Sequence, residues 1–164
     1  MTIIVKNKDT LIFDEFKFRC CIGKNGSSKN KIEGDKKTPK GEFKLENLYY
    51  REDRKILPKT NLKIIKIKKN MAWSDNMNVK KVYNRLTSLN TIVKTEKLFR
   101  KDFKYDFFIP IKYNWNKPVL GKGSAIFIHL TKNYEPTSGC IGICEKDFLI
   151  LIKLIKKNTK VKIL

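Results

Sequence analysis

The feature that most constrains this chain is a series of short segments in which apolar and polar residues alternate. Residues 16–21, 62–69 and 159–164 show this pattern, which has the period of two expected of β-strands. Glycine and proline residues between such segments predict turns. Residues 145–157 form one longer apolar run, with acidic residues at its start and lysines at its end, as in a helix. The pattern predicts a β-rich α+β fold with one or two helices, and it argues against regular βαβ repeats.

The stretch from residue 72 to residue 107 has no regular period. It contains clusters of polar and aromatic residues, and a single helical turn is predicted at residues 95–102. Because long irregular segments often carry binding residues, we expect the substrate to contact this part of the chain. The candidates to line a cleft are Trp73, Asp75, Tyr83 and Asn84. For the two aromatic residues among them, a place in the core is an equal alternative.

Length and charge limit the classes of function. The chain has 164 residues, which predicts a single domain over residues 1–164, and its net charge is +21. Such a charge suits a polyanionic partner, for example a nucleic acid or an acidic wall polymer. The lysines are, however, spread along the whole chain. A solvated lysine surface is therefore favoured, and no specific nucleic-acid partner is expected.

The cysteines and the first residues bear on the compartment. Cys20, Cys21, Cys140 and Cys144 lack the C-x-x-C spacing of metal and redox motifs, and a single histidine does not complete a zinc site, so no metal is predicted. No secretory signal is visible, and no apolar run reaches the ~18 residues of a membrane span. We therefore expect no membrane span, and we expect the protein to be a monomer. It would be cytoplasmic, or periplasmic if a leader precedes residue 1 in the natural chain.

His129, the only histidine, lies eleven positions before Cys140. If residues 124–131 form a strand, Ile126 and Ile128 share one face and Phe127 and His129 share the other. A polar loop then returns the chain to a Thr-Ser-Gly-Cys turn. The spacing permits the histidine and the cysteine to meet on one face of a sheet.

Such a meeting would have a clear chemical use. An imidazole can take the proton of a thiol, and the thiolate is the nucleophile. Backbone N–H groups near Gly139 could hold an oxyanion, and a helix beginning close to Cys140 would favour the thiolate. The alternative is a buried structural cysteine beside a core histidine, and spacing alone leaves both interpretations open.

Two blocks at opposite ends of the chain resemble the L,D-transpeptidase catalytic domain, the YkuD-type family. Residues 34–43 contain the Gly-Asp…Thr-Pro-x-Gly-x-Phe order of that family. His129, followed by a loop and by Thr-Ser-Gly-Cys at residues 137–140, is similar to its second signature. Four segments between the blocks are similar to a compact proteobacterial branch: residues 73–75, 83–85, 98–106 and 123–129. The resemblance covers nearly the whole chain.

The resemblance implies the L,D-transpeptidase fold, which is a mixed, sandwich-like or barrel-like sheet with one or two helices packed on it. It also implies acyl transfer on peptidoglycan stem peptides or muropeptides, without a metal or an organic cofactor. It implies Cys140 as the nucleophile, His129 as the general base and acid, and the Gly139 backbone as part of an oxyanion hole. A cytoplasmic member would instead serve as an L,D-carboxypeptidase that hydrolyses muropeptides during wall recycling. An alternative of another class is a basic polyanion-binding module with an inactive site. The intact histidine and cysteine favour the enzyme.

Two positions depart from the family pattern. Ser138 stands where many members have histidine, and Gly142 stands where many have arginine or asparagine. The cation that anchors the substrate's carboxylates would then be Arg19, Arg100 or a lysine. The predicted substrate-binding residues are Thr137, Ser138, Trp73, Tyr83, Asn84 and Arg19.

Overall fold

The protein is described by a computed structural model that covers residues 1–89 and 95–164. In these residues a single helix, α1 (Glu145–Leu154), accompanies a large number of short strands, and no helix is long and apolar enough to cross a membrane. The strands are β1 (Thr2–Lys6), β2 (Thr10–Phe13), β3 (Phe16–Cys21), β4 (Ser27–Ser28), β5 (Thr38–Pro39), β6 (Gly41–Lys44), β7 (Leu48–Tyr50), β8 (Ile64–Lys66), β9 (Met71–Ser74), β10 (Leu86–Ser88), β11 (Thr95–Lys97), β12 (Phe107–Pro110), β13 (Phe127–Leu130), β14 (Ile141–Ile143) and β15 (Lys160–Ile163).

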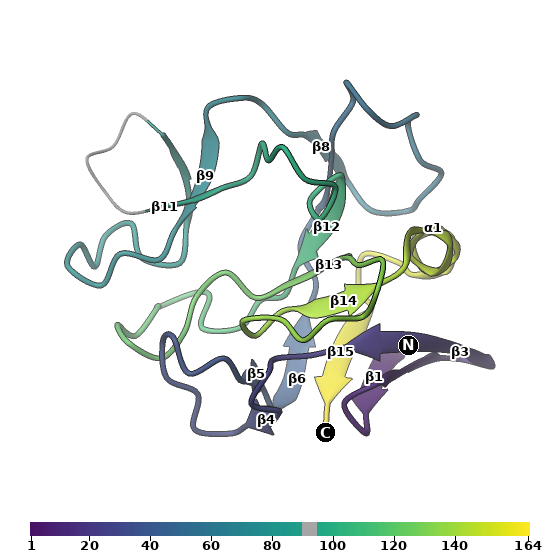
Figure 1. Ribbon diagram of the computed structural model, residues 1–164, viewed down its shortest axis with the longest axis horizontal. Helices are drawn as coiled ribbons and strands as arrows, with labels where there is room; N and C mark the ends of the chain where they lie inside the picture. The colour runs from purple at the N-terminus through teal and green to yellow at the C-terminus, as the bar shows by residue number, and fades with distance from the viewer. Residues whose placement is uncertain (90–94) are drawn as a thin grey trace.

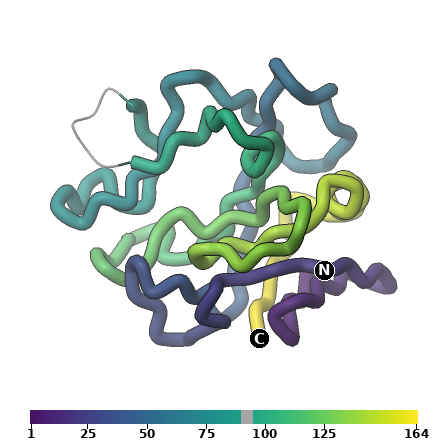
Figure 2. The backbone as a smooth tube through the Cα atoms, in the orientation of Figure 1, coloured from purple at the N-terminus to yellow at the C-terminus, as the bar shows by residue number. Residues whose placement is uncertain are grey.

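A ten-stranded mixed sheet carries the fold and curls into a half-barrel (Figure 1). Its strand order is β6-β15-β1-β2-β3-β14-β13-β12-β7-β8. Strands β1 and β15 pair in parallel, so the first and last segments of the chain lie side by side (Figure 2). Strands β13 and β14 are also parallel, and a loop joins them rather than a helix. These features confirm the predicted β-rich α+β fold with a barrel-like sheet.

A three-stranded sheet has the order β10-β9-β11, and its strands β9 and β11 lie on the other side of β13 from β1 (Figure 1). Strand β11 pairs with β9, with Thr95 opposite Ser74 and Lys97 opposite Ala72. The helical turn predicted at residues 95–102 is therefore wrong, because pairing with a distant strand outweighs a weak local preference. Residues 90–94 of the expected substrate-facing segment lie outside the described residues.

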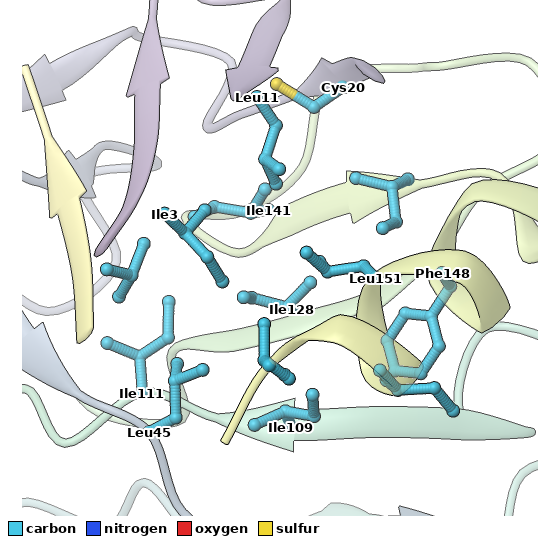
Figure 3. Packing of buried hydrophobic residues seen from close by; sticks show 14 of the residues in the cluster. Ile3, Leu11, Cys20, Leu45, Ile109, Ile111, Ile128, Ile141, Phe148 and Leu151 are labelled. Carbon is cyan, nitrogen blue, oxygen red and sulfur yellow. The ribbon is translucent and has the colours of Figure 1, made fainter. Parts of the chain in front are cut away.

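The main core lies between the large sheet and α1. Ile128 of β13, Ile141 of β14 and the α1 residues Phe148 and Leu151 are fully buried and point toward one another (Figure 3). Burying each such side chain contributes about 1.5–3 kcal/mol, which fixes α1 on the sheet. The helix begins at Glu145, as the acidic start of the apolar run predicts.

The opposite face of β13 packs on a second apolar cluster. Phe127 contacts Phe108 of β12 and Trp73 of β9, with ring centroids 4.9 Å and 5.3 Å apart, respectively. The predicted division of faces in this strand is confirmed, since Ile126 and Ile128 belong to the main core and Phe127 to the second cluster. Both faces of β13 are thus covered, and His129 lies on the side of the second cluster.

Candidate active site

Strand register brings Cys140 and His129 to the same face of the sheet. His129 of β13 lies directly opposite Gly142 of β14. Because side chains alternate along a strand, Cys140, two residues before Gly142, projects on the same side as His129. Diagonal neighbours of this kind are about 7–8 Å apart at the backbone, a distance that side chains can span. Both residues line one cavity of about 530 Å³.

The turn before Cys140 is held by Thr137. Its Oγ1 accepts a hydrogen bond from the Gly139 N–H at 3.0 Å and donates one to the Cys140 carbonyl at 2.6 Å. Gly139 has φ +140°, and a Cβ there would lie 2.9 Å from the Lys37 carbonyl oxygen. Only glycine fits this position without strain. The turn therefore places the thiol at the start of β14 with little freedom.

The Gly-Asp…Thr-Pro block forms the support beneath this turn. Asp35 accepts hydrogen bonds from the Lys37 N–H at 2.9 Å and from Lys31 Nζ at 2.7 Å. Thr38, which is fully buried, accepts the Gly23 N–H at 2.9 Å. The bonds with Asp35 hold the pKa of its carboxyl below its ordinary value although burial opposes them. The block thus holds the backbone that packs against Gly139.

The Cys140 thiol is bound on two sides by the neighbouring chain. Its Sγ donates to the Ala125 carbonyl at 3.2 Å and accepts the Phe127 N–H at 3.3 Å. Burial, and secondly the charge of Glu96, raise the pKa of this thiol to about 12, while Lys31 acts in the opposite direction. In the resting site the sulfur is therefore a protonated thiol.

The helix N-terminus does not assist this sulfur. Strand β14 separates Cys140 from α1, which begins at Glu145. Three extended residues span about 10 Å, and the helix-dipole effect fades within the first turn. The expectation that a nearby helix start favours the thiolate is therefore wrong.

His129 is buried in its neutral form. Its Nδ1 lies 2.9 Å from the Leu130 carbonyl oxygen, so the Nδ1–H tautomer donates there and leaves Nε2 as the basic atom. Burial lowers the pKa of His129 to about 4, against the opposing effect of the Leu130 carbonyl. The Tyr105 ring packs edge-on against the imidazole, with centroids 5.7 Å apart. At neutral pH the cavity is lined by a protonated thiol and an unprotonated imidazole.

The cavity has charged side chains of both signs. Its acidic groups are Glu33, Asp75, Glu96 and Glu135, and its basic groups are Lys31, Arg100, Lys104 and Lys132. A ligand that carries both ammonium and carboxylate groups suits such a lining better than a uniform polyanion does. In the described residues, no group of three or more His, Cys, Asp or Glu side chains is arranged to hold a metal ion.

Comparison with known protein families agrees with this geometry. The model of the L,D-transpeptidase catalytic domain, YkuD, matches residues 1–163. The chain belongs to the L,D-transpeptidase catalytic-domain family. No curated protein and no solved structure gives a significant match. The resemblance inferred from the two end blocks is confirmed, and the members of this family are generally enzymes that act on peptidoglycan.

Three predicted substrate-binding residues of this L,D-transpeptidase domain lie behind the cavity lining. Trp73 Nε1 donates to Asn84 Oδ1 at 2.9 Å, and the same oxygen accepts the Ala125 N–H at 3.1 Å. The Tyr83 hydroxyl donates to Glu33 Oε2 at 2.5 Å. All three side chains are buried. They hold Ala125 and Glu33, which do line the cavity.

The other predicted binding residues are divided between two hollows. Thr137 and Ser138 line the cavity beside Cys140. Arg19 lies at a second, smaller hollow of about 200 Å³, where its guanidinium stacks on Tyr134 at 4.4 Å. Of the cations proposed as substrate anchors, Arg100 lies in the cavity with Cys140 and Arg19 does not.

Gly142 is explained by its neighbour on β3. Gly142 lies opposite Cys21, and a Cβ at Gly142 would come within 2.7 Å of the Cys21 sulfur. A larger residue at this position would require Cys21 to move. The contact with Cys21 therefore explains why this chain has glycine at position 142, where many family members have arginine or asparagine.

Sequence reasoning missed Lys31, Glu33 and Glu96 as residues of the site. Glu96 sits in β11, where the sequence predicts a helical turn, and its place in the cavity depends on the pairing of β11 with β9. Lys31 is only 2% exposed. In a lysine-rich sequence, almost no local feature predicts which lysine is buried. The only local sign was the i,i+4 spacing of Lys31 and Asp35, which form an ion pair.

Proposed function

We propose that this chain is a cysteine acyltransferase that acts on peptidoglycan stem peptides through a thioester on Cys140. The observation that carries the proposal is the placement of Cys140 and the basic Nε2 of His129 at one cavity within a domain of the L,D-transpeptidase family. A thiol becomes an effective nucleophile when a positioned base removes its proton.

The chemistry would proceed in two halves. In the first, His129 Nε2 takes the Sγ proton while the sulfur attacks the carbonyl carbon of the diamino acid at stem position three. The tetrahedral oxyanion then collapses, the C–N bond to the D-residue at position four breaks, and the leaving amine takes the proton from His129. In the second half, an amine attacks the thioester carbonyl carbon and His129 accepts its proton. The C–S bond then breaks, and the leaving sulfur takes the proton from His129, which restores the Cys140 thiol.

The oxyanion donor in this scheme is the Cys140 N–H. The Gly139 N–H, the other predicted donor, is already bonded to Thr137 Oγ1. Gly139 contributes by its backbone shape, since it brings the chain into the turn that presents the Cys140 amide. If water replaces the amine, the same thioester yields a tripeptide, which is the L,D-carboxypeptidase outcome. Action on soluble muropeptides in the cytoplasm would favour that outcome.

The test is incubation of the purified protein with a disaccharide-tetrapeptide, with and without a free D-amino acid. Exchanged tetrapeptide supports acyl transfer to an amine, and tripeptide alone supports hydrolysis. Mass spectrometry of the quenched reaction should find the acyl group on Cys140 and none in Cys140→Ala. An adduct on Cys20 or Cys144 with none on Cys140 would contradict the proposal. Binding to nucleic acid that weakens steeply with salt and ignores Cys140→Ala would point to the polyanion-binding alternative.

A further inference from the structure

One wall of the cavity beside Cys140 gathers three carboxylates from distant segments. Glu33 precedes β5, Asp75 follows β9, and Glu96 lies in β11. Burial raises the pKa of the Glu96 carboxyl, and the charges of Asp75 and Glu33 add to that effect. Asp75 Oδ1 is buried and has no hydrogen-bond partner among the described residues. Both observations indicate that this wall is suited to a positively charged group.

Glu96 is held in place without being neutralised. The Tyr105 hydroxyl donates a short hydrogen bond to Glu96 Oε1, and the ring of the same tyrosine packs against His129. Arg100 Nη1 lies 3.8 Å from Glu96, whereas Arg100 Nη2 approaches Asp102 to 2.5 Å. The guanidinium is thus committed mainly to Asp102, and Glu96 keeps a carboxylate that faces the cavity.

The charge of Glu96 acts directly on the nucleophile. Among the charged neighbours of the Cys140 thiol, Glu96 has the largest influence, and it raises the pKa of the thiol in addition to the effect of burial. Lys31 lowers that pKa, and the Cys21 sulfur raises it further. Tyr105 also interacts with the thiol, and His129, Arg100 and Lys104 line the same cavity. In the free enzyme, Cys140 is therefore a protonated, unreactive thiol.

From this geometry we propose that Glu96 binds the side-chain ammonium group of the diamino acid in the stem peptide, and that this contact converts Cys140 from a resting thiol into a reactive one. A bound ammonium neutralises the carboxylate, so the penalty on the thiolate falls when the correct substrate is in place. A cavity of about 530 Å³ is large enough for a peptide residue of this size. Glu96 is then a specificity-determining residue and Tyr105 its positioning residue. This role presupposes the proposed acyl transfer at Cys140.

The first experiment needs no peptide substrate. Wild type and Glu96→Gln are treated with iodoacetamide over a range of pH, and alkylation of the Cys140 peptide is followed by mass spectrometry. Removal of the negative charge should shift the alkylation profile of Cys140 to lower pH and speed alkylation at pH 8 by roughly tenfold. The matched control is Glu135→Gln, which removes the same charge from an exposed residue at the rim of the cavity. It should leave the profile unchanged.

The second experiment measures recognition of the amine. Two synthetic stem tetrapeptides are compared, one with a free side-chain amine on its diamino acid and one in which that amine is acetylated. The wild type should acylate Cys140 roughly 10- to 100-fold faster with the free amine, as expected for a hydrogen bond between charged groups in a partly buried site. Glu96→Gln should lose most of this preference, and Tyr105→Phe should reduce it while the protein stays folded. A purely structural role of Glu96 would slow both peptides equally.

The outcomes separate this inference from the proposed function. Loss of amine preference together with faster alkylation in Glu96→Gln supports the role of Glu96. Equal rates with both peptides in the wild type, or an alkylation profile that Glu96→Gln does not shift, overturns it even if Cys140 forms the thioester. If neither peptide acylates wild-type Cys140, the proposed acyl transfer fails, and the alkylation profile still decides whether Glu96 controls the thiol.

Discussion

The two faces of strand β13 are both buried, yet they serve opposite purposes. On one face, Ile128 and Leu130 belong to the main apolar core beneath α1. On the other face, Phe127 packs in the second cluster, and His129 lies next to it at the cavity. Burial stabilises the fold on the first face. On the second face the same burial lowers the pKa of His129 and raises that of Cys140, so exclusion from water sets the protonation states of both side chains.

The largest effect on the cavity face of β13 is expected when the imidazole of His129 alone is removed. His129→Asn should slow thioester formation on Cys140 by roughly 10²–10⁴-fold, the usual contribution of a positioned general base. Mass spectrometry of the acylated protein over time measures the rate. The variant should show the circular dichroism spectrum of the wild type, and acylation at the wild-type rate would remove His129 from the mechanism.

The adjacent residue on the other face should show the opposite behaviour. Ile128→Ala leaves a cavity in the main core and should lower the free energy of unfolding by about 2–5 kcal/mol in urea titrations. Its acylation rate per folded molecule should stay within a few-fold of the wild type. A stability loss below about 1 kcal/mol would mean that this face is less tightly packed than its complete burial indicates.

The pH dependence of stability should distinguish the faces again. The pKa of His129 is lowered from 6.5 to about 4 by burial, so the unfolded state binds the proton more readily. The stabilisation from a neutral buried imidazole is therefore complete above pH 6.5 and is lost as the pH falls toward 4. Between pH 7 and pH 4 the wild type should lose up to about 3 kcal/mol more unfolding free energy than His129→Asn. Carboxyls such as Asp35 titrate in both proteins and cancel, and parallel curves would contradict the buried neutral state.

The smallest expected effect concerns the contact of Gly142 with Cys21 beside the site face. Gly142→Ala should destabilise the protein by about 1–3 kcal/mol, because its methyl group would meet the Cys21 sulfur. Cys21→Ala removes that sulfur, so the double variant should recover most of the loss. Thermal or urea unfolding of the wild type, the two single variants and the double variant completes this double-mutant cycle. Strictly additive losses would show that Cys21 does not set the size limit at position 142.

Much of this architecture follows from local patterns. Alternation in the short segments predicted the strands, and the acidic start of the apolar run predicted where α1 begins. The alternation of residues 126–129 placed His129 on the face opposite Ile128. The Thr-Ser-Gly-Cys motif predicted a turn directly before Cys140. These inferences succeeded because strand periodicity and turn chemistry are properties of neighbouring residues.

The parts that failed or were missed all depend on contacts between distant segments. The segment expected to form a helical turn at residues 95–102 contains β11, which pairs with β9, and this pairing brings Glu96 to the cavity that Cys140 lines. The helix expected near Cys140 is separated from it by β14, which forms because β13 and β3 lie on either side. The size limit at Gly142 comes from Cys21, 121 positions earlier in the chain. The roles of Arg19, Trp73, Tyr83 and Asn84 in binding stay predictions.

The amino-acid sequence by itself determined the family and the β-rich fold, and it singled out His129 and Cys140 as candidates for one site. Each of these depends on residue types and spacings that lie within one strand, one turn or one short block. Only the tertiary structure decided the protonation states of Cys140 and His129 and the place of Glu96 beside them. Those properties arise from exclusion of water and from charges only a few ångströms away, and folding alone brings such groups together.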